Sequence, residues 1–355
     1  MTQIDKVQAQ RPQMSRRRFT GRLLAVSGLA AGSTPLLLGR NAAGQQDSFF
    51  FRIGTGTTSG NYFLIGGVIA NAISNPPGSR PCDSGGSCGV PGLIAIALTT
   101  QGSVENIDLL ATQALESALC QADVAYWAYS GTGMYKDKPP FDKLRAVANL
   151  YQESLQIVVR ADSAISSIAD LKGKRVSLGE RGAGTRTTAT LVLNTFGIKE
   201  KQVKVEQMPI SVATGRLGAG TIDALFVVGG TPIPAIVALA SGTALRFLPV
   251  DGEKAEALRN QYPFLTVDLL PAGIYPDGAL IITVGVGTYW LVSADLGAEL
   301  VYGITKALWH PSTRKLLDEG SPIGRKIRMV TALLGLPIPL HDGAAKFYSE
   351  ASQTR

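Results

Sequence analysis

Three glycine-rich loops are the segments of this sequence best suited to binding a small anion. They read G-T-G-T-T-S-G at residues 54–60, T-T-Q-G-S at residues 99–103 and G-E-R-G-A-G-T-R-T at residues 179–187. Each is expected to join a strand to the start of a helix, where backbone N–H groups and the helix dipole favour negative charge. One such loop is usually only a turn, but three at the carboxyl ends of strands indicate a ligand site.

None of these loops has the spacing of a nucleotide-binding site. The first departs from G-x-G-x-x-G and is followed by no acidic residue before Asp83, so a nicotinamide or flavin is not expected. The third lacks the G-K-[ST] ending of a phosphate-binding loop. We therefore predict no cofactor. Arg186, in the third loop, could hold a carboxylate through two parallel hydrogen bonds, or could form a surface salt bridge instead.

One match to an enzyme motif offers an alternative function. G-G-S-C-G, at residues 85–89, satisfies G-x-S-x-G, in which Ser87 would be the nucleophile of an esterase. That motif needs a strand before it and a helix after it, whereas these flanks have the composition of a loop. Only His310 and His341 could act as its base. We interpret the match as chance, and so few histidines also argue against a metal site.

Two cysteines lie in a segment that reads as a loop. Residues 75–92, N-P-P-G-S-R-P-C-D-S-G-G-S-C-G-V-P-G, contain Cys82 and Cys88. In an oxidising compartment the two are expected to form a disulfide, and the alternative is two free thiols. Cys120 is expected to be a buried small hydrophobic residue at the end of a helix.

The positive charge of the chain is concentrated at its start. The net charge is +7, and residues 1–44 hold seven basic residues against one acidic residue, so the rest of the chain carries only +1. Nucleic acid is therefore not an expected partner. S-R-R-R-F-T at residues 15–20, an apolar stretch and N-A-A-G at residues 41–44 resemble a twin-arginine export signal. We predict that residues 1–44 are removed and that the protein is periplasmic; an uncleaved anchor is the alternative.

Strands and helices are expected to alternate after this signal. Apolar runs predict strands at residues 49–53, 123–126, 155–159, 176–178, 222–228 and 245–250. Helical spacing predicts helices at residues 62–73, 104–118, 187–196, 235–240 and 296–308, with Ser103 and Ser293 as N-caps and Gly197 as a stop. This order predicts an α/β fold with parallel sheets and helices on both faces.

Taken in order, several segments resemble one family of receptors. They are I-G-T-G-T-T-S-G-N-Y (53–62), Q-G-S-V-E-N (101–106), Q-A-D-V-A-Y (121–126), V-V-R-A-D-S (158–163), D-L-K-G-K-R-V-S-L-G (170–179), G-A-G-T-R (182–186), F-V-V-G-G-T-P-I-P-A-I (226–236), P-A-G-I-Y (271–275) and G-L-P-I-P-L-H (335–341). This set closely resembles the TAXI family of solute receptors, which serve tripartite ATP-independent periplasmic (TRAP) transporters. The resemblance covers nearly everything after the signal. Residues 75–92 depart from the family pattern, which runs directly from the first helix to the second strand.

The resemblance implies a two-lobed periplasmic binding protein fold, type II-like, in which each lobe is a sheet flanked by helices. Residues 45–148 and 285–355 would form the first lobe and residues 149–284 the second, hinged by crossover strands. The ligand would bind between the lobes, which would close on it.

The resemblance also implies a set of ligand-binding residues, which match the family's cleft positions. They are Thr57, Ser59, Asn61, Tyr62, Gln101, Ser103, Gln121, Asp123, Tyr126, Thr185, Arg186 and Tyr275. The implied ligand is a small organic anion or amino acid, glutamate-like or dicarboxylate-like. The implied partner is a TRAP membrane subunit driven by an ion gradient, and no catalysis is expected. A binding module for a cofactor or an aromatic acid is a further alternative.

Overall fold

The computed structural model describes residues 48–276 and 278–353. The predicted export signal and its cleavage site lie outside the described residues. Among the helices that are described, none is long and apolar enough to cross a membrane.

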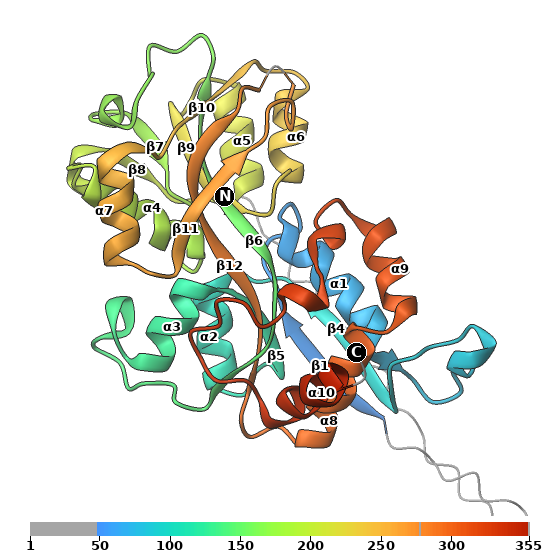
Figure 1. Cartoon of the computed structure of the whole chain (residues 1–355). Coiled ribbons are helices and arrows are strands. Elements are labelled where there is room, and N and C mark those ends of the chain that lie inside the picture. The colour runs from blue at the N-terminus through green and yellow to red at the C-terminus, as the bar shows by residue number, and fades with distance from the viewer. Residues whose placement is uncertain (1–47, 277, 354–355) are drawn as a thin grey trace, which may run out of the picture. The chain divides into compact units, whose positions relative to one another are not determined.

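A mixed sheet of ten strands forms the frame of the described chain (Figure 1). Its main path runs through β4 (Leu93–Leu98), β1 (Phe49–Gly54), β5 (Ser117–Gln121), β12 (Ile281–Ser293), β6 (Leu144–Arg160), β9 (Ala224–Gly229), β7 (Arg175–Ser177) and β8 (Lys204–Glu206). Two further strands flank this path: β10 (Leu245–Leu248) pairs with β6, and β11 (Leu265–Leu270) pairs with β12. Residues 74–75 (β2) and 90–91 (β3) form a separate small pair.

Two long strands connect the two lobes of the fold. β6 and β12 run antiparallel along each other from the Gly285–Ser154 pair to the Ser293–Leu144 pair. One end of this ribbon borders β5, and the other end borders β9, β10 and β11 (Figure 1). β1 pairs in parallel with β4 and β5, and β7 pairs in parallel with β8 and β9. The predicted α/β two-lobed fold is therefore confirmed. The expectation of purely parallel sheets was wrong, because the two connecting strands cross between the lobes in opposite directions.

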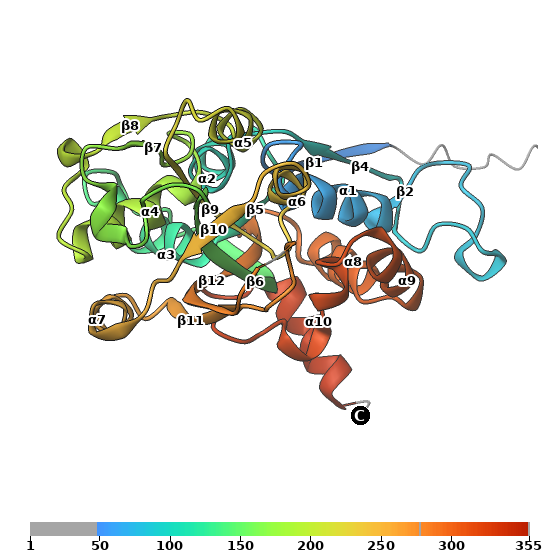
Figure 2. The same cartoon turned by 90° about the horizontal axis from the view of Figure 1, so that it is seen from above.

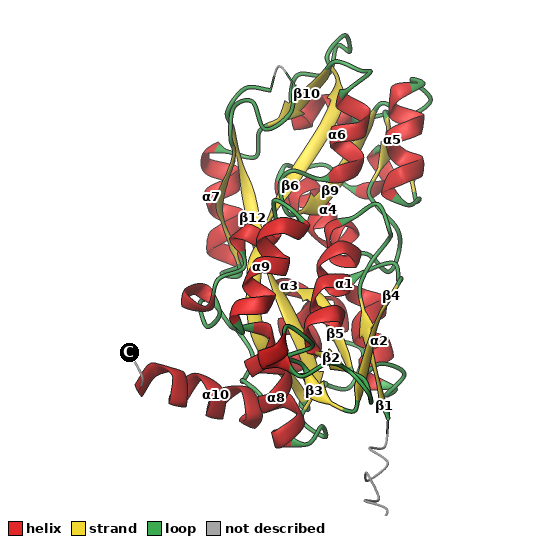
Figure 3. Cartoon of the chain, turned by 90° about the vertical axis from the view of Figure 1, so that its right-hand side faces the viewer, coloured by secondary structure: helices red, strands yellow, loops and turns green. Residues whose placement is uncertain are grey.

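Helices cover the sheet in both lobes. α1 (Asn61–Ile73), α2 (Ser103–Ala111), α3 (Ala122–Ser130), α8 (Ala298–Leu308), α9 (Pro311–Gly320) and α10 (Asp342–Gln353) surround the strands β1, β4 and β5. α4 (Gly184–Thr195), α5 (Ile210–Gly218), α6 (Pro234–Ala240) and α7 (Gly252–Gln261) accompany β7 to β11. Figure 3 shows α1 beside α9, and the two are in contact. Phe51 and Ile53 of β1, Ile65 and Ile69 of α1 and Trp290 of β12 are almost fully buried in the core that results.

One stretch of the sequence was assigned to the wrong elements. The predicted helix at residues 104–118 ends at Ala111, and residues 117–121 form β5, which pairs with β1 and β12. The predicted strand at residues 123–126 lies inside α3. Every residue of β5 is buried, and a short apolar run buried on both faces cannot be told from a buried helix by its period. Cys120 is buried as predicted, but in β5.

Both predicted N-caps were also wrong. Gly102, with a φ of 123°, precedes α2, and Ser103 is the first residue of that helix. Gly297 precedes α8, whereas Ser293 ends β12. By contrast, Gly197 lies just past α4 with a φ of 80°, in the left-handed region that glycine tolerates.

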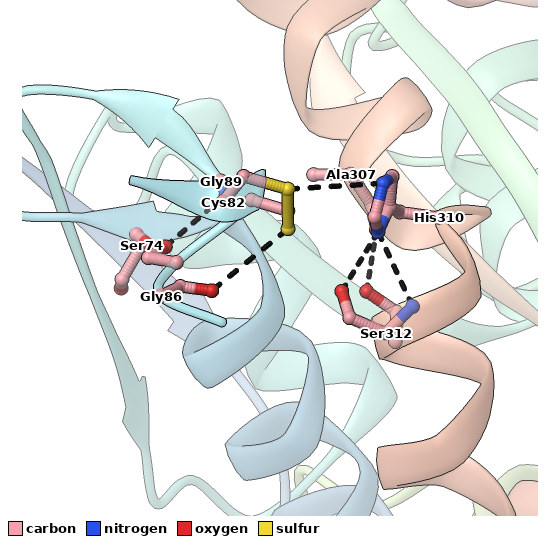
Figure 4. The surroundings of a disulfide bond; sticks show 10 residues. Ser74, Cys82, Gly86, Gly89, Ala307, His310 and Ser312 are labelled. Carbon is pink, nitrogen blue, oxygen red and sulfur yellow. Dashed lines mark hydrogen bonds between the residues drawn. A yellow bond between two sulfur atoms is a disulfide. The ribbon is translucent and has the colours of Figure 1, made fainter. Parts of the chain in front are cut away.

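The segment between α1 and β4 projects from the rest of the described chain (Figure 2). Within it, the Sγ atoms of Cys82 and Cys88 are bonded at 1.93 Å. Cys82 faces the Nε2 atom of His310, 3.9 Å away, at the residue that precedes α9 (Figure 4). The disulfide therefore lies where this segment meets the start of α9.

Mass spectrometry of unreduced peptides should find Cys82 and Cys88 in one linked species. The closed loop is short, so we expect the bond to stabilise the protein by about 2–3 kcal/mol at best. Buried Cys120 is the internal control and should react with an alkylating reagent only after unfolding. Alkylation of both Cys82 and Cys88 before any reduction would contradict the bond.

Candidate ligand-binding site

A cavity of about 110 Å³ opens where the three glycine-rich loops meet. Thr57 follows β1, Gln101 follows β4 and Thr185 follows β7, and all three line this cavity. Residues of β9 and of the segment before α5, such as Phe226 and Met208, close its other side. One water needs about 10–15 Å³ by a comparable measure, so the cavity suits a small molecule.

The structure brings most of the predicted ligand-binding residues to this cavity. Seven of the twelve line it: Thr57, Asn61, Tyr62, Gln101, Ser103, Gln121 and Thr185. They come from the starts of helices α1, α2 and α4, from the loops before these helices and, in the case of Gln121, from the last residue of β5. All three glycine-rich loops therefore border one cavity.

Arg186 does not line the cavity. Its Nη2 atom donates to Glu200 Oε1 at 2.5 Å, beyond the far end of α4. Arg186 is the third residue of α4, and its side chain is 18% exposed and pairs with Glu200, which follows that helix in the chain. This placement does not support the predicted pairing of Arg186 with a ligand carboxylate.

Four other predicted residues also lie outside the lining. The carboxylate of Asp123 is buried and accepts from the Val124 N–H at 2.8 Å and the Thr188 hydroxyl at 3.3 Å. Burial raises the pKa of Asp123 to about 6. This carboxylate therefore ties α3 to α4 and does not face the cavity.

The remaining three have structural contacts instead. Tyr275 donates from its hydroxyl to Gln156 and accepts from the Ile233 N–H, both at 2.9 Å. Tyr126 is exposed, with its ring centroid 6.2 Å from that of Phe264. The Ser59 hydroxyl lies 3.4 Å from that of Thr57, at the edge of the first loop.

An acidic residue that the sequence analysis missed lies in the wall of the cavity. Glu153 of β6 is 2% exposed, and its Oε2 atom accepts from the Tyr62 hydroxyl at 3.0 Å. Burial raises the pKa of Glu153 to about 8; the bond from Tyr62 acts against this rise, and nearby Asp123 adds to it. The available signal was that Glu153 is the one acidic residue of β6.

Asn106, a second missed residue, holds the loops in place. Its Nδ2 atom donates to the carbonyl oxygens of Thr55 and Leu119, each at 2.7 Å. Its Oδ1 atom accepts from the Thr100 hydroxyl at 2.8 Å. This one amide therefore joins the first loop, the second loop and β5.

The two lobes touch at the rim of the cavity. The carbonyl oxygen of Gly182, in the third loop, accepts from the N–H groups of Val104 and Glu105 at 3.0 and 3.2 Å. The N–H of Gly182 donates to Gln101 Oε1 at 3.0 Å. The first amides of α2 are thus occupied by the third loop rather than free for a ligand.

Helix N-termini and unpaired polar atoms face the remaining space. α1 and α4 begin at Asn61 and Gly184, and neither has a side-chain cap. Both amide atoms of Gln121 and the Oδ1 atom of Asn61 are buried without a hydrogen-bond partner among the described residues. Buried polar groups without partners are costly, so this site is suited to a ligand that would supply them.

The alternative site around Ser87 has a different geometry. The Ser87 hydroxyl donates to the carbonyl oxygen of Ser74 and accepts from the Gly89 N–H at 3.2 Å. A short turn at residues 82–84 and the two-residue strand β3 flank it, not the strand and helix that a nucleophile elbow needs. This geometry gives no support to the esterase alternative. Side-chain atoms of Cys82, Cys88 and His310 lie within 4.8 Å of one another, but the disulfide occupies both sulfurs (Figure 4).

Comparison with known proteins identifies the family. Residues 53–351 match the NMT1-like family. Among solved structures, the chain is similar to PhnD1 from Prochlorococcus marinus in complex with methylphosphonate, with a TM-score of 0.49, 12% identity and coverage of 86% of this chain and 98% of that one. It is also similar to the alkanesulfonate-binding protein SsuA from Xanthomonas axonopodis pv. citri bound to MOPS, with a TM-score of 0.46, 15% identity and coverage of 86% and 80%. The family match extends over most of the sequence, and the protein therefore belongs to the NMT1-like family.

Proposed function

We propose that this protein is an extracytoplasmic solute-binding receptor that captures a small carboxylate-bearing metabolite and delivers it to a membrane transporter. The observation that carries this proposal is a cavity lined by loops from both lobes, with uncapped helix N-termini at its edge. Such N-termini stabilise anions without a charged side chain.

In this proposal the lobes comprise residues 45–148 with 285–355, and residues 149–284. The boundaries fall inside β6 and β12, the two strands that run through both lobes. Bending of this ribbon would open and close the cavity, as in other hinged receptors.

The transporter is proposed to be of the TRAP type and the receptor to be a periplasmic TAXI protein. This part of the proposal is supported by the ordered motifs from residue 53 to residue 341 and by the twin-arginine pattern at residues 15–20.

A thermal-shift screen of organic acids and amino acids, with neutral sugars and organic cations as comparison compounds, tests the ligand class. A ligand that binds only the folded protein, present at 100 times its Kd, stabilises by about 2.7 kcal/mol. For a chain of this size that corresponds to a rise in Tm of several degrees. A screen in which only neutral sugars or cations raise the Tm would reject the carboxylate proposal.

Gln121→Ala and Arg186→Ala are expected to differ in their effect on binding. Gln121 offers unpaired amide atoms at the cavity, so its loss should weaken the affinity for the compound found in the screen by about 5- to 20-fold. Arg186 pairs with Glu200 instead, so its loss should change the affinity by less than about 3-fold. Titration calorimetry on both variants measures this. A large loss of affinity in Arg186→Ala would indicate that Arg186 contacts the ligand after all.

A further inference from the structure

The charged side chains that line the cavity within the described chain are both acidic. They are Glu153 and Glu180, and the lining of this cavity contains no lysine, arginine or histidine among the described residues. Any attraction for an anion must therefore come from peptide dipoles at the starts of helices. An ionised Glu153 would oppose that attraction at short range.

Every titratable group around Glu153 would be neutral or negative. Tyr62 approaches from α1, Asp123 from α3, Cys120 from β5 and Tyr151 from the same strand, β6. A buried carboxyl group without a positive partner favours its protonated, neutral form. The pKa of Glu153 is consistent with these neighbours, because burial, the largest cause, raises it to about 8.

The Tyr62 hydroxyl donates to Glu153 Oε2 at 3.0 Å, and the nearby Thr288 hydroxyl also acts to lower the pKa of Glu153. Gln121 and Asn61 lie on the same cavity and are 2% and 6% exposed, with amide atoms that have no partner within the described part of the chain. A protonated carboxyl group beside these amides adds an O–H donor to the wall. A carboxylate ligand has only acceptor atoms and requires such donors.

We propose that Glu153 acts in this cavity as a neutral carboxylic acid that donates a hydrogen bond to an organic anion, whose charge is stabilised by the N-termini of α1 and α4. This inference rests on the proposed function and names the chemistry of the same site. If Glu153 is ionised in the free protein, its carboxylate must then take up one proton when the anion binds. The opposite assignment, an ionised Glu153 that holds an ammonium group of the ligand, is an outcome of the test below.

Calorimetry with two probes distinguishes these assignments. Succinate carries two carboxylates and no ammonium group, and L-glutamate carries both. For the wild-type protein, we expect succinate to bind about 10-fold more weakly at pH 9 than at pH 6, because about one tenth of Glu153 is protonated at pH 9. Titrations in borate and in Tris, which both buffer near pH 9 and differ in ionisation enthalpy, should show about one proton taken up per succinate at pH 9.

Glu153→Gln keeps the shape of the neutral acid and removes its titration. We expect this variant to bind succinate at pH 9 within about 3-fold of the wild-type affinity at pH 6, with neither pH dependence nor proton uptake. Glu256→Gln, on the exposed face of α7, is the matched control and should behave as the wild-type protein does. A loss of 10-fold or more in the affinity of Glu153→Gln for L-glutamate at pH 6 would overturn the proposal in favour of an ionised anchor. Wild-type binding without pH dependence would overturn it too.

A measurement without ligand separates this inference from the proposed function. The pKa of Glu153 in the folded protein lies above its ordinary value of 4.5, so the folded state binds more protons than the unfolded state between the two values. The stability of the wild-type protein should therefore fall as the pH rises from about 5 to 8. The Tm of Glu153→Gln relative to wild type should rise by several degrees over that range and then stay constant. If neither probe binds at any pH, the carboxylate function fails, and this titration alone decides the state of Glu153; a constant Tm difference would reject a neutral acid.

Discussion

Replacing Asn106 with leucine is expected to lower the free energy of unfolding by about 3 kcal/mol or more. The side chain of Asn106 is fully buried and makes three hydrogen bonds, to Thr55, Thr100 and Leu119. Leucine has a similar size but no polar atoms, so the buried partners would lose these bonds, each at a cost of about 1–3 kcal/mol. Denaturant unfolding of the variant measures the loss.

Asn71→Leu is the matched control for this change. Asn71 lies on the exposed face of α1, where the same substitution should alter the stability by less than about 0.5 kcal/mol. Because Asn106 joins the first two glycine-rich loops to β5, its replacement should also weaken ligand binding, and the control should not. Equal stability of the two variants would show that these loops are held by other contacts.

Replacing Gly184 with alanine is expected to weaken ligand binding by roughly 10- to 100-fold. Gly184 is the first residue of α4, and a Cβ atom there would lie 1.5 Å from Gln121 Oε1 and 3.0 Å from Ser103 Oγ. Gln121 is buried and lines the cavity, so its side chain would have to move into the space that the ligand needs. Overpacking of this kind costs about 1–3 kcal/mol, which corresponds to the stated loss of affinity.

This overpacking should destabilise the closed arrangement of the two lobes rather than the fold of either lobe. Gly184 is not one of the glycines with a positive φ, and alanine favours helices. The variant should therefore unfold within a few degrees of the wild-type Tm. Gly215→Ala in α5 is the control, because nothing lies within 4 Å of a Cβ atom there. The probe is whichever of succinate and L-glutamate binds the wild-type protein. Unchanged affinity in Gly184→Ala would mean that α4 does not approach Gln121 in the bound state.

Local sequence patterns were sufficient where one segment carries the whole signal. The apolar run at residues 49–53 followed by G-T-G-T-T-S-G predicted β1, its loop and α1, because an apolar run and a glycine-rich turn are each defined within a few residues. The same reasoning placed the third loop before α4 and the stop of that helix before Gly197. Cys82 and Cys88 were predicted to pair because the export-signal pattern implies an oxidising compartment, and the structure bonds them.

The element order of residues 104–126 was decided by the sheet rather than by the local pattern. S-A-L-C-Q at residues 117–121 becomes a strand because β1 and β12 offer their edges on both sides of it. The helix then begins at Ala122, one residue later. An apolar run without polar alternation satisfies either element until its neighbours are in place.

The sequence alone therefore predicted which loops meet at the cavity, because these loops are marked by glycines, short polar side chains and helix starts. Only the tertiary structure decided which charged residues line that cavity. Arg186 is the third residue of its helix and meets Glu200, 14 positions further along the chain. Glu153 reaches the cavity because β6 passes between the lobes beside Tyr62, 91 positions away. The direction of a side chain and the burial that shifts its pKa depend on neighbours distant in sequence, and no local pattern carries that information.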